Sequence, residues 1–305
     1  MSKVIRIGTR DSQLALWQAH TVEKKLNDLG YQTEIVAVKS TGDLILDKPL
    51  YELGITGIFT KTLDVAMING QIDIAVHSMK DVPTALPIGI VQAAVLERAS
   101  EKDILVYKHN NDFYHEDATI ASGSLRRQAQ WLHRYPHHKV VDLRGNVNTR
   151  LQKLADNDWN GAIFASAGLD RIGVKPENFI DLDWMLPAPA QGAMVVVAME
   201  NDDFCREAVG KLNHFETEIC THIERDFLRT LEGGCTAPIG AFAEIIDNEI
   251  RFEGALLSVD GKEKLAIEKT SETTHYKTFG RGCALEILKN GGDDLMAKIR
   301  SELNK

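Results

Sequence analysis

Hydrophobic positions near the start of the chain follow two alternating spacings. Short apolar runs at Val4–Ile7, Thr33–Val38 and Ile72–Val76 are typical of strands. Between them, Ser12–Leu29 and Thr60–Asn69 carry apolar residues at the spacing of helices that pack on a sheet. This alternation predicts an α/β domain with a largely parallel sheet.

The first predicted helix has a clear apolar side. The residues at helical spacing that are expected to face the sheet are Leu14, Trp17, Val22, Leu26 and Leu29. Gly30 is expected to end this helix, because glycine readily takes the left-handed conformation that follows a last turn.

A second alternation of strand and helix patterns begins near Ile104 and predicts another α/β domain. Its strands are predicted at Thr119–Ala121, Val140–Leu143 and Ala162–Ala165, with helices that begin near Ser124 and Val147. The segment Leu186–Gly192 is rich in proline and alanine, which suits a hinge where the chain returns to its first domain. The apolar strand Met194–Ala198 follows it.

The pattern changes again from about Thr217, where a helix to Leu231 precedes a group of strands. These strands are predicted at Ile239–Ile246, Glu249–Ser258 and Lys264–Lys269, with a hairpin turn at Asp260–Gly261 and helices at the end. We therefore expect three domains. Residues 1–98 with 193–214 and residues 99–192 form two α/β domains, and residues 215–305 form an α+β domain with an antiparallel sheet.

Composition narrows the class of protein. Of the 305 residues, 44% are hydrophobic and 26% are charged, as in an ordinary globular enzyme. The formal charge of -9 argues against a nucleic-acid partner. Without an apolar signal core or a run of membrane-spanning length, we expect a cytoplasmic protein with no membrane partner. The cysteines lack zinc spacing, so no metal is predicted, and the absence of heptads indicates a monomer.

One segment reverses the acidic balance. Between Ser122 and Arg150 a single acid, Asp142, stands against a cluster of basic residues: Arg126, Arg127, Arg134, Lys139, Arg144 and Arg150. Such a cluster in an acidic protein repels itself unless an anion fills it. The sequence therefore predicts an anionic small-molecule ligand.

Two predicted helix starts concentrate these arginines. In the first, Ser122 or Ser124 is the expected cap, and Arg126 and Arg127 occupy the first turn. Arginine there opposes the helix dipole, and a bound carboxylate or phosphate would resolve the conflict. The alternative is a solvated basic face.

The second helix start repeats this arrangement after the next strand. Arg144 lies at the strand end, Asn146 or Asn148 is the expected cap, and Arg150 lies in the first turn. Arginines at two successive helix starts strengthen the prediction of a carboxylate or phosphate site.

The segment His77–Thr84 (HSMKDVPT) follows a buried strand, so its polar residues emerge where α/β sheets bind ligands. Asp81 beside Lys80 can stay ionised and stabilise a positive charge, or pass a proton to a leaving amine. The alternative is a solvated ion pair on a loop. We interpret His77 as a structural hydrogen-bonding residue and not as a base.

Cys235 lies behind paired glycines in the segment Gly233–Gly240 (GGCTAPIG). Glycines allow a backbone conformation that presents a thiol to a ligand, although a small core residue is the alternative.

The first strand-to-helix turn carries Arg10 and Ser12, and Ser12 considered alone is best explained as a helix cap. Together these features indicate a cleft for polycarboxylates with a covalent anchor.

Nearly the whole chain resembles the porphobilinogen deaminase family. The motifs that carry the resemblance are GTRDSQLALWQA, VHSMKDVPT, GSLRRQAQ, LRGNVNTRL, AGLDRI, PAQGA and EGGCTAPIGAFA. The resemblance implies two α/β lobes similar to those of periplasmic binding proteins and a third domain. It also implies an enzyme of heme biosynthesis that joins four porphobilinogen molecules head to tail into hydroxymethylbilane and releases ammonia at each step.

The resemblance further implies roles for individual residues. Cys235 matches the cysteine that holds the dipyrromethane cofactor through a thioether, and Asp81 matches the catalytic carboxylate. The implied cofactor-binding residues are Ser78, Lys80, Ser124, Arg126, Arg127, Arg144 and Arg150. The implied substrate-binding residues are Arg10, Ser12, Arg144, Arg150, Arg171 and Gln191. Thr56 departs from the lysine of many members, which puts one accessory cationic contact in doubt.

Two other functions compete with this one. A two-lobed protein that binds small anions without chemistry would need neither the thiol nor Asp81 beside the arginines. A cysteine hydrolase would need a histidine partner, and neither His77 nor His222 is convincingly placed for that role.

Overall fold

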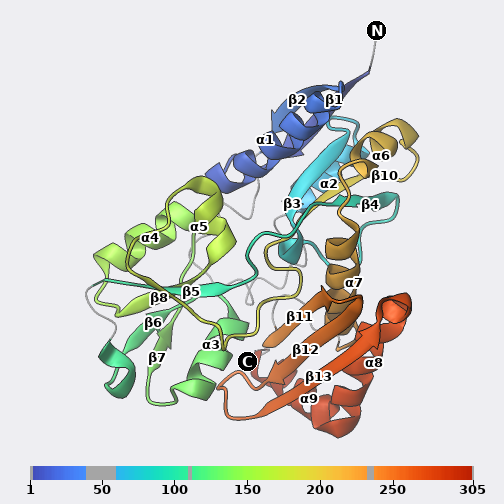
Figure 1. Ribbon diagram of the computed structural model, residues 1–305. Coiled ribbons are helices and arrows are strands. Elements are labelled where there is room, and N and C mark those ends of the chain that lie inside the picture. The colour runs from blue at the N-terminus through green and yellow to red at the C-terminus, as the bar shows by residue number, and fades with distance from the viewer. Residues whose placement is uncertain (1–2, 39–59, 109–111, 232–236, 304–305) are drawn as a thin grey trace. The chain divides into compact units, whose positions relative to one another are not determined.

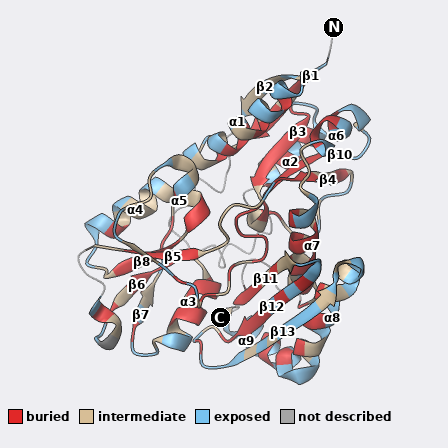
Figure 2. Cartoon of the chain, viewed as in Figure 1, coloured by how far each residue is buried: buried red, intermediate tan, exposed pale blue. Residues whose placement is uncertain are grey.

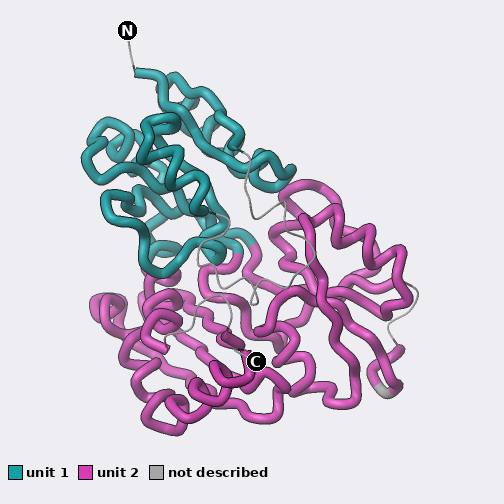
Figure 3. Tube along the Cα trace, turned by 180° about the vertical axis from the view of Figure 1, so that it is seen from behind, with its two compact units in different colours: residues 1–45, 55–99, 192–218 teal, residues 46–54, 100–191, 219–305 magenta. Residues whose placement is uncertain are grey.

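The computed structural model describes residues 3–38, 60–108, 112–231 and 237–303. The chain divides into two compact units (Figure 3). Unit 1 holds residues 1–45, 55–99 and 192–218, and unit 2 holds residues 46–54, 100–191 and 219–305. Three sheets organise the described residues, one in unit 1 and two in unit 2.

The sheet of unit 1 has the strand order β2-β1-β3-β10-β4 (Figure 1). Its strands are β1 (Val4–Thr9), β2 (Gln32–Ala37), β3 (Ile74–Ser78), β4 (Ile90–Val95) and β10 (Met194–Met199). β1, β2 and β3 are parallel, whereas β10 runs antiparallel to both of its neighbours. The largely parallel sheet expected from the sequence is thus parallel on one side only, because the returning strand enters it in the opposite direction.

Helices α1 (Gln13–Asp28) and α6 (Asp203–Gly210) share a core with this sheet, and α2 (Lys61–Ile68) packs against β1 and β3. Val22 and Leu26 are buried as predicted. The expectation for Trp17 and Leu29 is wrong: they are 37% and 49% exposed. Helical spacing identifies an apolar stripe, but the width of the sheet beneath decides which edge of that stripe is covered.

The first sheet of unit 2 repeats the same arrangement, with the order β7-β6-β8-β5-β9. Its strands are β5 (Asp103–Tyr107), β6 (Thr119–Ala121), β7 (Lys139–Val141), β8 (Gly161–Ala165) and β9 (Phe179–Asp181). β6, β7 and β8 are parallel, and β5 is antiparallel to β8 and β9. One face packs on α3 (Leu125–Arg134), and the other packs on α4 (Val147–Asp156) and α5 (Ser166–Ile172). Figure 2 shows β5, β6 and β8 largely buried between these layers, whereas the edge strands β7 and β9 are more exposed.

The second sheet of unit 2 is an antiparallel meander of β11 (Ile239–Ile246), β12 (Glu249–Leu257) and β13 (Lys264–Glu272). One face forms a core with the part of α7 (Phe215–Thr230) that follows Glu218, with α8 (Tyr276–Ile287) and with α9 (Asp293–Leu303). Two α/β sheets and one antiparallel sheet confirm the expected fold class. The boundaries of three domains stay a prediction.

The turns of the antiparallel sheet differ in how well the sequence marks them. The expected turn at Asp260–Gly261 is present, and Gly261 has a φ of 73°. The first turn, at Asp247 and Asn248, has positive φ at both residues and was not predicted. No helix among the described residues has the length and apolar character needed to cross a membrane.

Candidate active site

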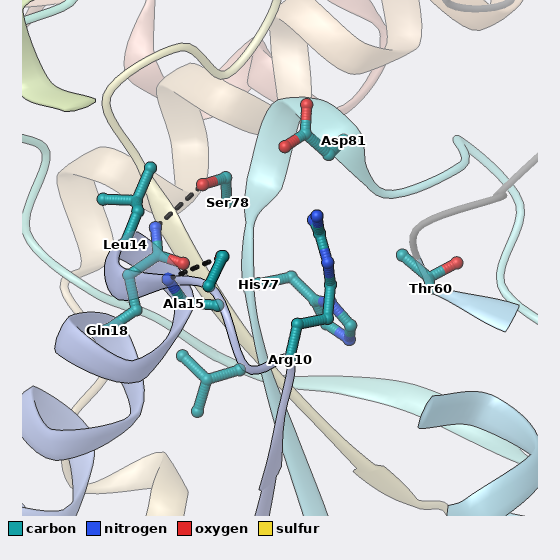
Figure 4. A pocket seen from close by; sticks show the side chains of 10 residues that line it. Arg10, Leu14, Ala15, Gln18, Thr60, His77, Ser78 and Asp81 are labelled. Atoms are coloured by element: carbon teal, nitrogen blue, oxygen red, sulfur yellow. Dashed lines mark hydrogen bonds between the residues drawn. The ribbon is translucent and has the colours of Figure 1, made fainter. Parts of the chain in front are cut away.

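A small cavity in unit 1 lies at the carboxyl ends of β1 and β3 (Figure 4). Its volume is about 60 Å³. The residues that line it are Arg10, Ser12, Leu14, Ala15, Gln18, Thr60, Val76, His77, Ser78 and Asp81. The side chains of Arg10 and Asp81 converge on it from two different connections (Figure 4). The cavity thus gathers the predicted site residues Arg10, Ser12, Ser78 and Asp81.

Local geometry fixes the connection that carries Arg10. The backbone passes close to a neighbour at Gly8, where a Cβ atom would lie 2.2 Å from Cδ1 of Ile72. Ser12 is the N-cap of α1, and its Oγ accepts a hydrogen bond from the backbone N–H of Ala15 at 3.4 Å. The helix-cap interpretation of Ser12 is confirmed, and the cap holds Arg10 at the rim of the cavity.

A short 3-10 turn, η3 (Met79–Asp81), presents the carboxylate after β3. Val82 N–H donates to the carbonyl of Met79 at 3.2 Å and closes the turn. Ser78 Oγ accepts a hydrogen bond from Nε2 of Gln18 at 2.8 Å. Lys80 lies beside Asp81 in the same turn but does not line the cavity.

His77 is the buried ionisable group of this cavity. It is 6% exposed, and its Nε2 has no hydrogen-bond partner among the described residues, which does not support the hydrogen-bonding role expected from the sequence. Burial, with a smaller contribution from the positive charge of Arg10, lowers the pKa of His77 to about 4. The imidazole is therefore neutral near pH 7 and adds no charge to the cavity.

The predicted cationic residues of unit 2 lie along one edge of its first sheet. Arg126 and Arg127 follow β6, Arg144 follows β7, and Arg171 lies on α5 after β8. Because β6, β7 and β8 are parallel, the connections that leave their carboxyl ends share that edge. Gly123 lets two of these connections pass closely, since a Cβ there would lie 2.3 Å from the carbonyl oxygen of Leu143.

The helix caps differ between the two starts. Asn146 is the N-cap of α4, and its Oδ1 accepts from Thr149 N–H at 2.9 Å, which decides between the two expected asparagines. Ser124 occupies the N-cap position of α3, but its side chain makes no cap hydrogen bond. The Nε of Arg150 donates to the carbonyl of Gly145 at 2.8 Å.

Burial acts on the arginines of this edge. Arg126, Arg127 and Arg144 are 4%, 5% and 7% exposed. Burial lowers the pKa of Arg144, with Asp142 acting in the opposite direction, and lowers the pKa of Arg171 to about 10. Guanidinium groups taken out of water in this way favour an anion that restores their solvation.

Asp103 joins three predicted site residues and was missed by the sequence analysis. Its carboxylate, 0% exposed, pairs with Arg126 and Arg127 and also accepts a hydrogen bond from Gln191. In the sequence, an aspartate at the start of a strand carries no signal that separates it from a surface acid.

Two predicted features lie outside the described residues: the proposed attachment residue Cys235 and the departure at Thr56. The roles predicted for the site residues stay predictions.

Comparison with known proteins accounts for nearly the whole chain. Residues 5–207 match the family model "Porphobilinogen deaminase, dipyromethane cofactor binding domain", and residues 218–289 match "Porphobilinogen deaminase, C-terminal domain". The chain belongs to the porphobilinogen deaminase family. This confirms the resemblance that the motifs indicated.

Individual members of the porphobilinogen deaminase family are similar over most of their length. Porphobilinogen deaminase of Chlorobium phaeobacteroides is 38% identical, with 98% of this chain and 99% of that protein covered. The chloroplastic porphobilinogen deaminase of Oryza sativa subsp. japonica is 42% identical, with 97% and 84% covered. Among solved structures, the periplasmic VFT2 domain of Bordetella pertussis BvgS is 14% identical, with a TM-score of 0.42 over 68% of this chain and 86% of that chain.

The dipyrromethane cofactor named by the porphobilinogen deaminase model carries acetate and propionate side chains, so its site must supply cationic donors. Nε of Arg126 is buried and has no hydrogen-bond partner among the described residues. Two guanidinium groups, those of Arg126 and Arg127, also face the single carboxylate of Asp103. An orphaned donor and a surplus positive charge both fit a bound carboxylate.

Proposed function

We propose that this protein is a transferase that condenses four porphobilinogen molecules head to tail into hydroxymethylbilane and releases ammonia at each step. Family membership supports the reaction and its place in tetrapyrrole synthesis. The single observation that carries the chemistry is the cavity that holds the Asp81 carboxylate and the Arg10 guanidinium together. A carboxylate there suits the cationic centre of the reaction, and a guanidinium suits the acidic side chains of porphobilinogen.

Asp81 is proposed to act on the aminomethyl group of porphobilinogen. Its carboxylate accepts hydrogen bonds from the ammonium and pyrrole N–H groups, so the amine can leave as ammonia. The same negative charge then stabilises the azafulvenium cation that remains, until carbon–carbon bond formation and loss of a proton restore the pyrrole. Neutral His77 adds no competing positive charge to this half of the cavity.

Side-chain carboxylates of the pyrroles are assigned to cationic, hydroxyl and amide donors. In unit 1 these are Arg10 and Ser12, with Ser78 and Lys80 nearby. In unit 2 they are Ser124, Arg126, Arg127, Arg144, Arg150, Arg171 and Gln191. The bidentate geometry of arginine suits carboxylates better than the single ammonium of lysine does.

The dipyrromethane cofactor is proposed to be attached to Cys235 through a thioether. When bound, the group supplies a pyrrole with a free α position that accepts the first substrate unit. The residues assigned above bind the carboxylates of the cofactor and hold the growing product in position for each addition.

Intact-protein mass after mild purification tests this function. We expect an excess equal to two linked pyrroles, which is lost in Cys235→Ser. An anion-binding protein without chemistry and a cysteine hydrolase both predict no such excess. A wild-type protein of unmodified mass that does not consume porphobilinogen would refute the proposal.

Asp81→Asn tests the role of the carboxylate. This change keeps the shape of the side chain but removes its charge, so the cofactor mass should persist while turnover falls by about a hundredfold or more. Stopped assays of porphobilinogen consumption measure this. Turnover close to that of the wild type would reject the role of Asp81.

The proposal also includes a cytoplasmic, monomeric enzyme without nucleic-acid or membrane partners. The acidic net charge of -9 supports the absence of a nucleic-acid partner. Light scattering after gel filtration tests the monomer, and fractionation of cells tests the location.

A further inference from the structure

A buried cluster in unit 2 is built around the carboxylate of Asp103. Oδ1 accepts hydrogen bonds from Nε and Nη2 of Arg127, at 3.0 and 2.7 Å, and from Nε2 of Gln191 at 2.8 Å. Oδ2 lies 2.7 Å from Nη2 of Arg126. One side chain therefore contacts three others that come from two distant parts of the chain.

The position of Asp103 is itself rigid. It is the first residue of β5, paired with Ala165 of β8, and its carbonyl accepts a hydrogen bond from Leu182 N–H at 2.9 Å. A carboxylate with 0% exposure on a central strand has little freedom to move. The side chains that hydrogen-bond to this carboxylate are therefore also held in fixed positions.

Further hydrogen bonds complete the orientation of the two arginines. Nη1 of Arg127 donates to the carbonyl of Ile163 at 3.1 Å, and Nη1 of Arg126 donates to the carbonyl of Leu186 at 2.7 Å. Arg127 thus uses all three of its nitrogens on protein groups. Arg126 keeps Nε buried without a partner among the described residues.

Charge explains why a carboxylate is needed there. Burial lowers the pKa of Arg126, Asp103 opposes that effect, and Arg127 reinforces it. Two adjacent guanidinium groups at a helix start would repel each other and the helix dipole if Asp103 did not compensate one of them. The two guanidinium groups carry one more charge than the Asp103 carboxylate compensates, so a carboxylate of the ligand can bind there.

We propose that Asp103 is a positioning residue that orients Arg126 for the carboxylates of the cofactor and substrate, with Arg127 and Gln191 as structural braces. Gln191 is 0% exposed, and its Nε2 donates to the carbonyl of Glu101 at 2.6 Å and to Asp103 at 2.8 Å. The inference rests on the proposed function. It gives different roles to residues that are all assigned to carboxylates above: Arg126 faces the ligand, whereas Arg127 and Gln191 hold Asp103 in place.

The test compares Asp103→Asn with a matched control, Asp73→Asn. Asp73 forms a similar two-pronged pair with Arg6, at 2.9 Å to Nε and 2.8 Å to Nη2. Arg6 lies in β1 and Asp73 directly precedes β3, and neither residue lines the cavity. Both changes remove the charge of a buried carboxylate that pairs with an arginine, although Arg6 is 38% exposed whereas Arg126 is 4% exposed. Only Asp103→Asn removes the partner of predicted ligand-binding residues.

Three measurements are made on each purified holoprotein: the fraction with the cofactor mass, KM and kcat for the loaded fraction, and the thermal midpoint. For Asp103→Asn we expect a lower fraction of protein with the cofactor, an unchanged kcat and a KM raised about tenfold or more. This change in KM corresponds to the loss of one hydrogen bond between a charged group and the substrate. For Asp73→Asn we expect a lower thermal midpoint with normal loading and KM. Normal loading and KM in Asp103→Asn, or a lower KM from the added positive charge, would overturn the proposal.

Asp103→Glu supplies the second variant if Asp103→Asn does not fold. It keeps the charge but displaces the carboxylate by about 1.5 Å, the length of one carbon–carbon bond. Positioning predicts a raised KM for this variant, whereas charge compensation alone predicts a normal KM and would overturn the proposal. Wild-type protein that carries the cofactor and consumes porphobilinogen separates either result from a failure of the proposed function.

Discussion

The neutral, buried imidazole of His77 makes stability depend on pH in a way that can be calculated. Burial lowers its pKa from 6.5 to about 4. A proton therefore binds the unfolded chain more tightly than the folded protein, and the contribution of His77 to stability is complete above pH 6.5 and lost as pH falls. Relative to about pH 7.5, the loss is about 1.3 kcal/mol at about pH 5.5 and about 2.5 kcal/mol at about pH 4.5.

The assay is urea unfolding of the wild type and of His77→Gln at these pH values. Glutamine does not titrate, so only the wild type loses this contribution as pH falls. The free energy of unfolding of the wild type minus that of His77→Gln should therefore decrease by the stated amounts. Contributions of other groups, such as His138, whose burial also lowers its pKa, are common to both proteins and cancel. A difference that stays constant between pH 7.5 and 4.5 would refute the reasoning, because His77 would then titrate alike in both states.

Two further predictions follow from close contacts in unit 2. Gly123→Ala would place a Cβ 2.3 Å from the carbonyl oxygen of Leu143, so the free energy of unfolding should fall by about 1–3 kcal/mol and cofactor loading should drop. Urea unfolding measures the first effect and intact mass the second. Gly210→Ala is the control, because a Cβ at Gly210 meets open space. Glu224→Gln should also cost about 1–3 kcal/mol in urea unfolding, because its two oxygens accept hydrogen bonds from Ala190 N–H at 2.6 Å and Ala243 N–H at 2.8 Å. An unchanged free energy of unfolding would contradict the packing argument for Gly123→Ala or the hydrogen-bond argument for Glu224→Gln.

Local chemistry made several parts of the protein predictable from its sequence. Ser12 begins α1 and Gly30 follows its end, because a hydroxyl satisfies free N–H groups and glycine takes a positive φ. The strand patterns of β11 and β12 were also read correctly, since alternation marks a sheet with one face on a core. The motifs around Asp81 identified the family, because a reactive site needs particular side chains at a fixed spacing.

Tertiary structure decided what depends on distant neighbours. The direction of β10, the exposure of Trp17 and the turn at Asp247 follow from which surfaces meet, and local spacing does not encode that. Asp103 is the clearest case. It is an ordinary acid in the sequence, and only the fold brings it to the arginines of α3 and to Gln191, 88 residues away along the chain. Sequence determines which groups are present and which elements they favour, while the free energy of a buried charge depends on partners that only the folded chain supplies.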